Sequence, residues 1–111
     1  MGEVPHSGGS AFPRTAAPPG ACDCHIHVYD RRFPAIGPGQ EILEHAAVPD
    51  YRRFQQRIGT SRAVIVQASC HGSDNRAMLD AQAWRPEHYR GVAILDENTP
   101  GTDIPVMHRA G

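Results

Sequence analysis

Three stretches of the sequence have the hydrophobic pattern of β-strands. Residues 21–27 (ACDCHIH) alternate between two faces, which predicts a strand that is polar on one side. The residues of the polar face are Asp23, His25 and His27, and those of the other face are Cys22, Cys24 and Ile26. Residues 63–68 (AVIVQA) and 91–95 (GVAIL) are almost entirely apolar. Such runs are typical of parallel strands that are covered on both faces.

Three stretches bounded by helix-start and helix-stop residues alternate with these strands. In the first stretch, Pro49 is suited to the first turn of a helix and Gly59 to its end. Apolar side chains recur on one face between them. Pro86 prevents the second from continuing past about Trp84, and Gly111 would end the third as a left-handed cap. The expected helices span about residues 49–58, 73–84 and 102–110.

This alternation of strands and helices predicts an α/β fold with a parallel sheet. A complete (β/α)8 barrel takes roughly 250 residues, so three strands cannot close one. We therefore expect the N-terminal three βα units of a (β/α)8 TIM barrel, truncated at the C-terminus. Residues 1–20 are rich in Pro, Gly and Ser and predict a disordered leader, which leaves the partial barrel to residues 21–111. The long connection 28–47 predicts a lid or binding loop.

Charge and cysteine content exclude several function classes. Lys and Arg number 11 and Asp and Glu 12, so no field of one sign exists to attract nucleic acid or an anionic membrane. No apolar run approaches the roughly 18 residues of a membrane span. The three cysteines are an odd number, and no secretory signal precedes them. This favours a reducing cytoplasm.

The pair His25 and His27 is the strongest chemical signal. The strand period of two directs both imidazoles to one side, within reach of one metal ion or substrate. At the end of a first barrel strand, the pair would face the mouth where active sites of this fold lie. The plain alternative is two surface or core histidines that happen to lie two residues apart.

A competing interpretation is a structural zinc site. Its ligands would be Cys22, Cys24, Cys70 and His71. The spacing CxC lacks the usual two-residue gap, and Cys22 and Cys24 are expected on the helix-facing side of their strand. Buried apolar cysteines are therefore the simpler expectation.

Residues 67–75 (QASCHGSDN) form the second informative stretch, because they lead from a buried strand through a glycine turn to a helix start. Backbone N–H groups at such a place favour an anion, with Ser69 and His71 as additional donors. The alternative, equally supported, is that Ser73, Asp74 and Asn75 only cap and turn the chain. Asp96 is interpreted as a loop-capping residue.

The motifs DCHIHV, VIVQASCHGSDN and RGVAILD resemble the 2-pyrone-4,6-dicarboxylate lactonases of the amidohydrolase superfamily, over about residues 20–111. The resemblance implies a cytoplasmic hydrolase of bacterial aromatic catabolism that reversibly opens a small dicarboxylate lactone. It implies no bound metal, with catalytic His25 and His27 polarising the lactone carbonyl, and Ser69 and His71 binding a substrate carboxylate. A tyrosine of the family's long loop falls at Ile42.

The resemblance also implies that the carboxylate-binding arginines and the water-activating aspartate lie beyond these residues, so the chain alone is expected to be inactive. Two other functions stay open. One is a metal-dependent decarboxylase or hydratase of the same superfamily, in which His25 and His27 would ligate zinc or a related divalent ion. The other is a non-catalytic metal-binding or interaction module. The sequence leaves the oligomeric state open.

Overall fold

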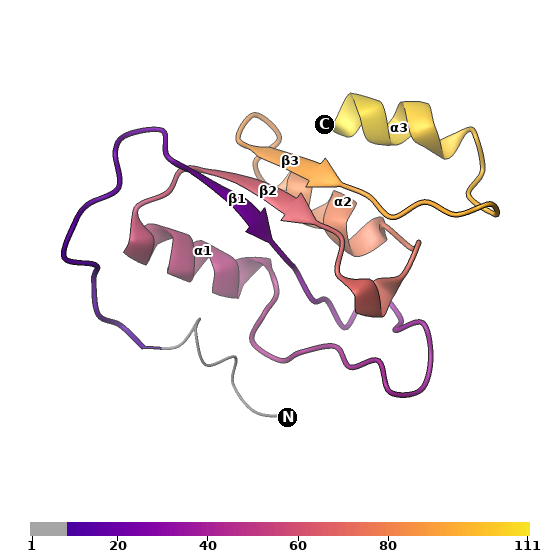
Figure 1. The fold of residues 1–111 in the computed structure, drawn as a ribbon, viewed down its shortest axis with the longest axis horizontal. Coiled ribbons are helices and arrows are strands. Elements are labelled where there is room, and N and C mark those ends of the chain that lie inside the picture. Colours follow the sequence, from indigo (N-terminus) through magenta and orange to yellow (C-terminus); the bar gives the residue numbers. More distant parts are fainter. Residues whose placement is uncertain (1–8) are drawn as a thin grey trace.

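The computed structural model describes residues 9–111, which form an open parallel sheet of three strands in the order β1-β2-β3 with helices packed beside it (Figure 1). Its elements are β1 (Cys22–Ile26), α1 (Val48–Ile58), β2 (Arg62–Val66), a 3-10 turn (Ser69–His71), α2 (Arg76–Ala83), β3 (Tyr89–Val92) and α3 (Asp103–Ala110). Figure 1 shows α1 on the β1 side, α2 behind β2 and β3, and α3 beyond β3. The predicted order of strands and helices is confirmed. No helix in the described part is long and apolar enough to cross a membrane.

The third strand begins earlier than the apolar pattern predicts. Tyr89 pairs with Ala63 and is almost fully buried, so the ladder to β2 starts there rather than at residue 91. Ile94 and Leu95, which were expected inside the strand, follow it and are 37% and 48% exposed. The physical reason is register, since the ladder follows the positions that β2 offers and not the local run of apolar residues.

The core lies between the sheet and the helices α1 and α2. Its buried apolar residues are Ile26, Val28, Val48, Ala63, Ile65, Met78, Ala81 and Tyr89. Helix α1 contributes only Val48 and Gln55 as fully buried residues. The hydroxyl of Tyr89 donates a 2.8 Å hydrogen bond to Oε1 of Gln55, so both polar atoms are satisfied where they are buried.

One extra residue in β1 changes which side chains face the helices. Asp23 is paired with Ala63 and Ile26 with Ile65, so β1 advances by three residues where β2 advances by two. This β-bulge turns both Asp23 and Ile26 toward the face of the buried β2 residues, and Asp23 accepts a hydrogen bond from Tyr51 of α1. The regular alternation expected from the sequence, with Asp23 on the face of the two histidines, is therefore wrong for Asp23.

The N-terminal segment runs past the end of α1. The leader predicted for residues 1–20 lies partly outside the described residues, and residues 9–20 contain no helix or strand. Arg57 of α1 donates a hydrogen bond to the carbonyl oxygen of Gly9, and Arg62 donates one of 2.8 Å to that of Gly20. The described part of the leader is thus fastened at both of its ends.

Candidate active site

The two candidate catalytic histidines stand at the carboxyl end of β1. His25 lies within the strand, His27 directly follows its last residue, and both side chains are exposed. Their ring centroids are 5.1 Å apart, and the rings meet edge to face at 85°. Because β1 and β2 are parallel, the turn that contains Ser69 follows β2 at the same edge of the sheet. The topology therefore gives the paired imidazoles and this turn a common rim.

The ring of His27 is oriented by the neighbouring strand. Its Nδ1 lies 2.9 Å from the carbonyl oxygen of Val66. A carbonyl oxygen can only accept, so Nδ1 carries a proton and Nε2 is left for other partners. In the neutral ring Nε2 holds a lone pair that can accept a proton or bind a metal ion. In the charged ring Nε2 is a donor that can polarise a carbonyl oxygen. The protonation state of His27 thus decides which chemistry it performs.

Two buried amides hold the turn after β2 in shape. Nε2 of Gln67 donates hydrogen bonds of 2.8 Å to the carbonyl oxygens of Gly72 and Asp74. The amide of Asn75 both donates to and accepts from the backbone of Ile94, at 2.9 and 3.0 Å. Apart from the presence of the two amide side chains, nothing in the sequence predicted these hydrogen bonds. The turn is consequently a rigid scaffold between β2 and the segment after β3.

Within this turn, Ser69 and His71 have different surroundings. Ser69 is exposed, and within residues 9–111 its hydroxyl has no hydrogen-bond partner, so it is available to a ligand. The ring of His71 has no exposed surface. Its Nε2 lies 3.2 Å from the backbone nitrogen of Asp30, and its Nδ1 lies 3.1 Å from the carbonyl oxygen of Pro34. The loop 28–47 thus covers the ring and occupies both nitrogens, and substrate binding by His71 stays a prediction.

Asp74, in the turn after β2, and Asp96, in the turn after β3, both accept hydrogen bonds from nearby backbone groups, as the capping interpretation predicted. The carboxylate of Asp74 accepts hydrogen bonds from the backbone and guanidinium of Arg76 at the start of α2. These bonds lower the pKa of Asp74. A fixed carboxylate at this helix start stabilises the helix and disfavours a second anion there. Asp96 likewise accepts from the backbone nitrogen of Asn98 at 2.9 Å, and its expected role as a loop cap is confirmed.

The cysteines do not form the alternative zinc site. Among the described residues, no group of three or more His, Cys, Asp and Glu side chains could hold a metal ion. Cys70 is buried as expected, but Cys22 is half-buried and Cys24 is exposed, with its thiol 3.6 Å from the carbonyl oxygen of Cys22. The expectation of buried cysteines is therefore right only for Cys70. Burial raises the pKa of the Cys70 thiol, which keeps it protonated.

His45 is a rim residue that the sequence did not single out. It lines a small cavity of about 50 Å³ together with His27, Asp50 and Tyr51. Its φ of 54° lies in the left-handed region, which is uncommon for residues other than glycine and is concentrated at functional sites. The backbone nitrogen of Tyr29 donates to the carbonyl oxygen of Ala46 at 2.9 Å, and this bond holds His45 beside the end of β1.

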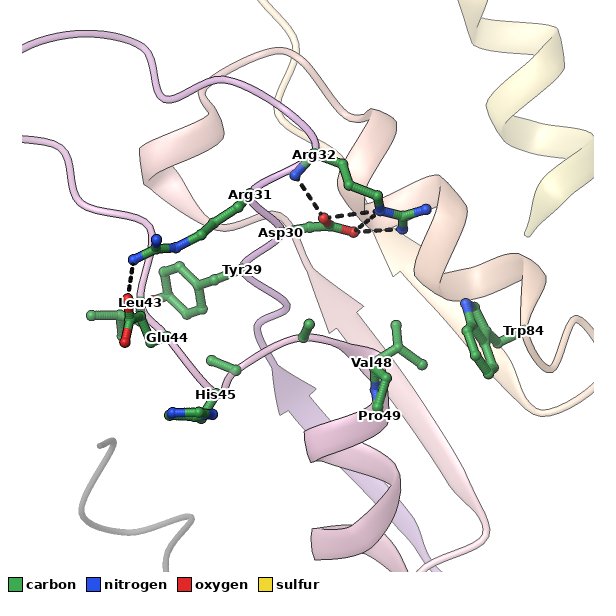
Figure 2. A pocket seen from close by; sticks show the side chains of 12 residues that line it. Tyr29, Asp30, Arg31, Arg32, Leu43, Glu44, His45, Val48, Pro49 and Trp84 are labelled. Carbon is green, nitrogen blue, oxygen red and sulfur yellow. Dashed lines mark hydrogen bonds and ion pairs between the residues drawn. The ribbon is translucent and has the colours of Figure 1, made fainter. Parts of the chain in front are cut away.

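A larger pocket of about 430 Å³ opens between the same loop, the start of α1 and the end of α2 (Figure 2). Residues that contribute its walls are Tyr29, Leu43, Val48, Pro49 and Trp84. Arg31 pairs with Glu44 at 2.5 Å, and Arg32 bridges Asp30 and Asp80 at 2.6 and 2.5 Å. The guanidinium of Arg32 holds the pKa of Asp30 below its usual range. Both arginines already have carboxylate partners, so this pocket offers apolar walls rather than a free anion site.

Comparison with known proteins identifies the family. The amidohydrolase family model matches residues 22–111. The 2-pyrone-4,6-dicarboxylate hydrolase of Comamonas testosteroni is 34% identical over 101 residues, which are 89% of this chain and 33% of that protein. The D-galactarolactone isomerase of Agrobacterium fabrum is 34% identical over 114 residues, 100% of this chain and 39% of that protein. The chain thus spans between a third and two fifths of the length of these relatives.

The fold comparison agrees with the sequence comparison. A crystal structure from Agrobacterium tumefaciens superimposes with a TM-score of 0.78 at 34% identity, covering 92% of this chain and 37% of that one. The predicted fold, the N-terminal part of a TIM barrel, is confirmed by this match. Because the family model covers most of the chain and the structural match follows the same region, the chain belongs to the amidohydrolase family.

Proposed function

We propose that this chain supplies the carbonyl-polarising part of the active site of an amidohydrolase that opens a carboxylated lactone, such as a 2-pyrone-4,6-dicarboxylate. The observation that carries the proposal is the exposed pair His25 and His27 at the carboxyl end of β1. Active sites of TIM barrels lie at this end of the strands. The exposed hydroxyl of Ser69 supports the proposal as a hydrogen-bond donor to a substrate carboxylate on the same rim.

The fixed orientation of His27 defines its part in the reaction. With Nδ1–H donated to Val66, a charged His27 directs Nε2–H at the lactone carbonyl oxygen, and His25 provides a second imidazole 5.1 Å away. As water adds to the carbonyl carbon, these donors stabilise the negative charge that develops on the oxygen. The ring C–O bond then breaks, and the leaving oxygen takes a proton. Loss of one such donor costs roughly 10²–10³ in kcat.

The attacking water also needs a general base. The carboxylates around the end of β1 are committed elsewhere, since Asp23 accepts from Tyr51 and Asp30 is paired with Arg32. Asp50, which lines the small cavity with His27, accepts a hydrogen bond from the backbone nitrogen of Ala47 and is paired with Arg53. The base is therefore expected in a part of the barrel that corresponds to the remaining length of the relatives. The 111-residue chain by itself is expected to bind weakly and to turn over no lactone.

A metal-dependent reaction is an alternative use of the same two histidines, His25 and His27. A neutral His27, with Nδ1–H on a backbone carbonyl, has the arrangement common for a metal-ligating imidazole. A catalytic zinc ion, however, takes about three protein ligands. The described residues bring together two imidazoles and no third ligand beside them. The fit is therefore incomplete within these residues, and a third ligand, like the general base, would have to come from the part of the barrel that corresponds to the remaining length of the relatives.

Isomerisation of a lactone is a second candidate activity. The D-galactarolactone isomerase of Agrobacterium fabrum matches this chain over its whole length, at the same identity as the pyrone hydrolase. Both reactions begin with polarisation of a lactone carbonyl, so the chemistry of His25 and His27 serves either one. The two activities differ in which oxygen attacks the carbonyl carbon, a water or a hydroxyl group of the substrate.

The test uses the gene product that carries this chain, with the wild type and the variants His25→Gln, His27→Gln and His108→Gln. We expect each of the first two substitutions to lower the rate of pyrone dicarboxylate hydrolysis roughly 10²–10³-fold. His108, exposed on α3, is the matched control and should retain the wild-type rate. Galactarolactone in a parallel assay separates hydrolase from isomerase. Wild-type rates in both His25→Gln and His27→Gln would overturn the proposal.

The three cysteines bear on the compartment in which the protein works. In the described part of the chain all three are free thiols. This supports the proposal of a reducing compartment such as the cytoplasm. Thiol labelling of the protein directly on cell lysis should modify Cys24, its exposed cysteine, and a fully oxidised thiol at that position would contradict the proposal.

A further inference from the structure

The long loop 28–47 is fastened to the turn after β2 through one buried imidazole. His71 follows β2, yet both of its nitrogens bond to the loop, at the backbone nitrogen of Asp30 and at the carbonyl oxygen of Pro34. A third bond runs in parallel, from the backbone nitrogen of Ile36 to the carbonyl oxygen of Cys70 at 2.9 Å. These contacts join segments about 35 to 40 residues apart in sequence. The loop is therefore held by the turn.

The partners of His71 require one form of its ring. The carbonyl oxygen of Pro34 can only accept, so Nδ1 must carry a proton. The backbone N–H of Asp30 can only donate, so Nε2 must carry a lone pair. The ring is therefore neutral, with its proton on Nδ1. The other neutral form, or the charged ring, would set N–H groups face to face in a place from which water is excluded.

The fastened loop carries residues that flank the paired histidines. The ring centroid of Tyr29, next to Asp30 in sequence, lies 6.3 Å from that of His27. The backbone of Tyr29 in turn holds Ala46, and with it His45, which lines the small cavity that contains His27. A shift of the loop at Asp30 would therefore also displace Tyr29 and His45.

We propose that His71 is a positioning residue, whose neutral Nδ1–H ring latches the loop 28–47 so that Tyr29 and His45 are held beside His27. The latch is a property of the described chain and does not depend on the proposed function. Its consequence for substrate binding, the shaping of the rim around the lactone by Tyr29 and His45, rests on that function.

The form of the ring can be observed directly in the unmodified chain. In long-range proton–nitrogen NMR spectra of the histidine-labelled chain at neutral pH, His71 should show a protonated Nδ1 and an unprotonated Nε2. Its two nitrogen shifts should be clearly different, because each nitrogen has a different hydrogen-bond role. A proton on Nε2 of His71 in the folded chain would overturn the latch. This measurement needs no substitution and therefore no assumption about folding of a variant.

The variant His71→Phe keeps an aromatic ring of similar size but removes both hydrogen bonds. We expect the amide of Asp30 to exchange with solvent at least about 10-fold faster, because its buried N–H group loses its acceptor. The amide of Ile36 should also exchange faster, because the loop that carries it is no longer held by the ring. The ring signals of His27 and His45 should shift, and the amides of β2 should keep their protection. His108→Phe is the control and should change none of these. Unchanged exchange at Asp30 in a folded His71→Phe chain would refute the latch.

The two proposals can fail separately. If the NMR spectra and the exchange rates agree with the latch while the gene product that carries this chain neither binds nor turns over a lactone, the latch is supported and the proposed function is refuted. If lactone turnover depends on His25 and His27 but amide exchange in the loop does not change in His71→Phe, the proposed function is supported and the latch is refuted.

Discussion

The hydroxyl of Tyr51 lies 3.2 Å from a carboxylate oxygen of Asp23 and joins helix α1 to strand β1. This contact exists because the β-bulge turns Asp23 toward the helix. It removes Asp23 from the site in which the regular alternation would have put it. The three residues that were predicted to share the polar face of the first strand therefore have different surroundings. Asp23 supports the fold, whereas His25 and His27 remain exposed.

The contact predicts a specific loss of stability in Tyr51→Phe. Removing one partly buried hydrogen bond to a carboxylate should lower the free energy of unfolding by about 1–2 kcal/mol, measured by chemical denaturation. Tyr29→Phe is the matched control, because within the described chain the Tyr29 hydroxyl has no hydrogen-bond partner. It should cost less than about 0.5 kcal/mol. Equal losses in the two variants would contradict the role assigned to Asp23 and Tyr51.

The ion pair of Asp30 with Arg32 predicts a loss of stability in acid. Arg32 lowers the pKa of Asp30 from its ordinary value of 3.8. A carboxyl group whose pKa is lower in the folded state stabilises that state above the ordinary value. The stabilisation is lost as the pH falls through the lowered one. Thermal melts between about pH 7 and about pH 2 should therefore show a decline that is smaller in Asp30→Asn. An identical decline in both proteins would exclude this contribution.

Gly72 is predicted to be essential for the approach of the loop to the turn. Its φ is +56°, and a Cβ at this position would collide with Cγ2 of Ile36. Gly72→Ala should therefore cost about 1–3 kcal/mol from backbone strain, in addition to the clash. The double variant with Ile36→Ala should recover part of the loss. Gly101→Ala, where a Cβ would meet nothing, is the control and should be nearly neutral. A neutral Gly72→Ala in denaturation experiments would show that the loop does not pack there.

Metal removal separates the two mechanisms open to His27. If charged imidazoles polarise the carbonyl, the gene product that carries this chain should hydrolyse the pyrone at an unchanged rate after exhaustive chelation. The control is elemental analysis of the chelated protein, to verify that less than one ion per chain remains. Activity that is lost on chelation and restored by zinc would assign the protein to a metal-dependent mechanism instead.

The sequence by itself determined the elements whose limits are local. Helix α1 runs from Val48 to Ile58, within one residue of the prediction, because Pro49 and Gly59 act through their own backbone preferences. Helix α3 likewise ends at the expected Gly111. The apolar run in β2 predicted a parallel strand, although only the face of Ala63 and Ile65 is buried and the coverage expected on both faces is wrong. The period of two placed the paired histidines at the end of β1. Each of these signals depends on residues that are close together in the chain.

The tertiary structure decided what depends on distant partners. The ladder to Ala63 set the start of β3 at Tyr89, and the register with β2 placed the bulge that turns Asp23 to the helix. Ser69 and His71 lie in the same turn with similar local sequence signals, yet one is exposed and the other buried. Their difference arises because the loop 28–47 packs over one side of the turn. Hydrogen bonds to residues some 40 positions away fix the ring of His71 in place, and no local pattern encodes them.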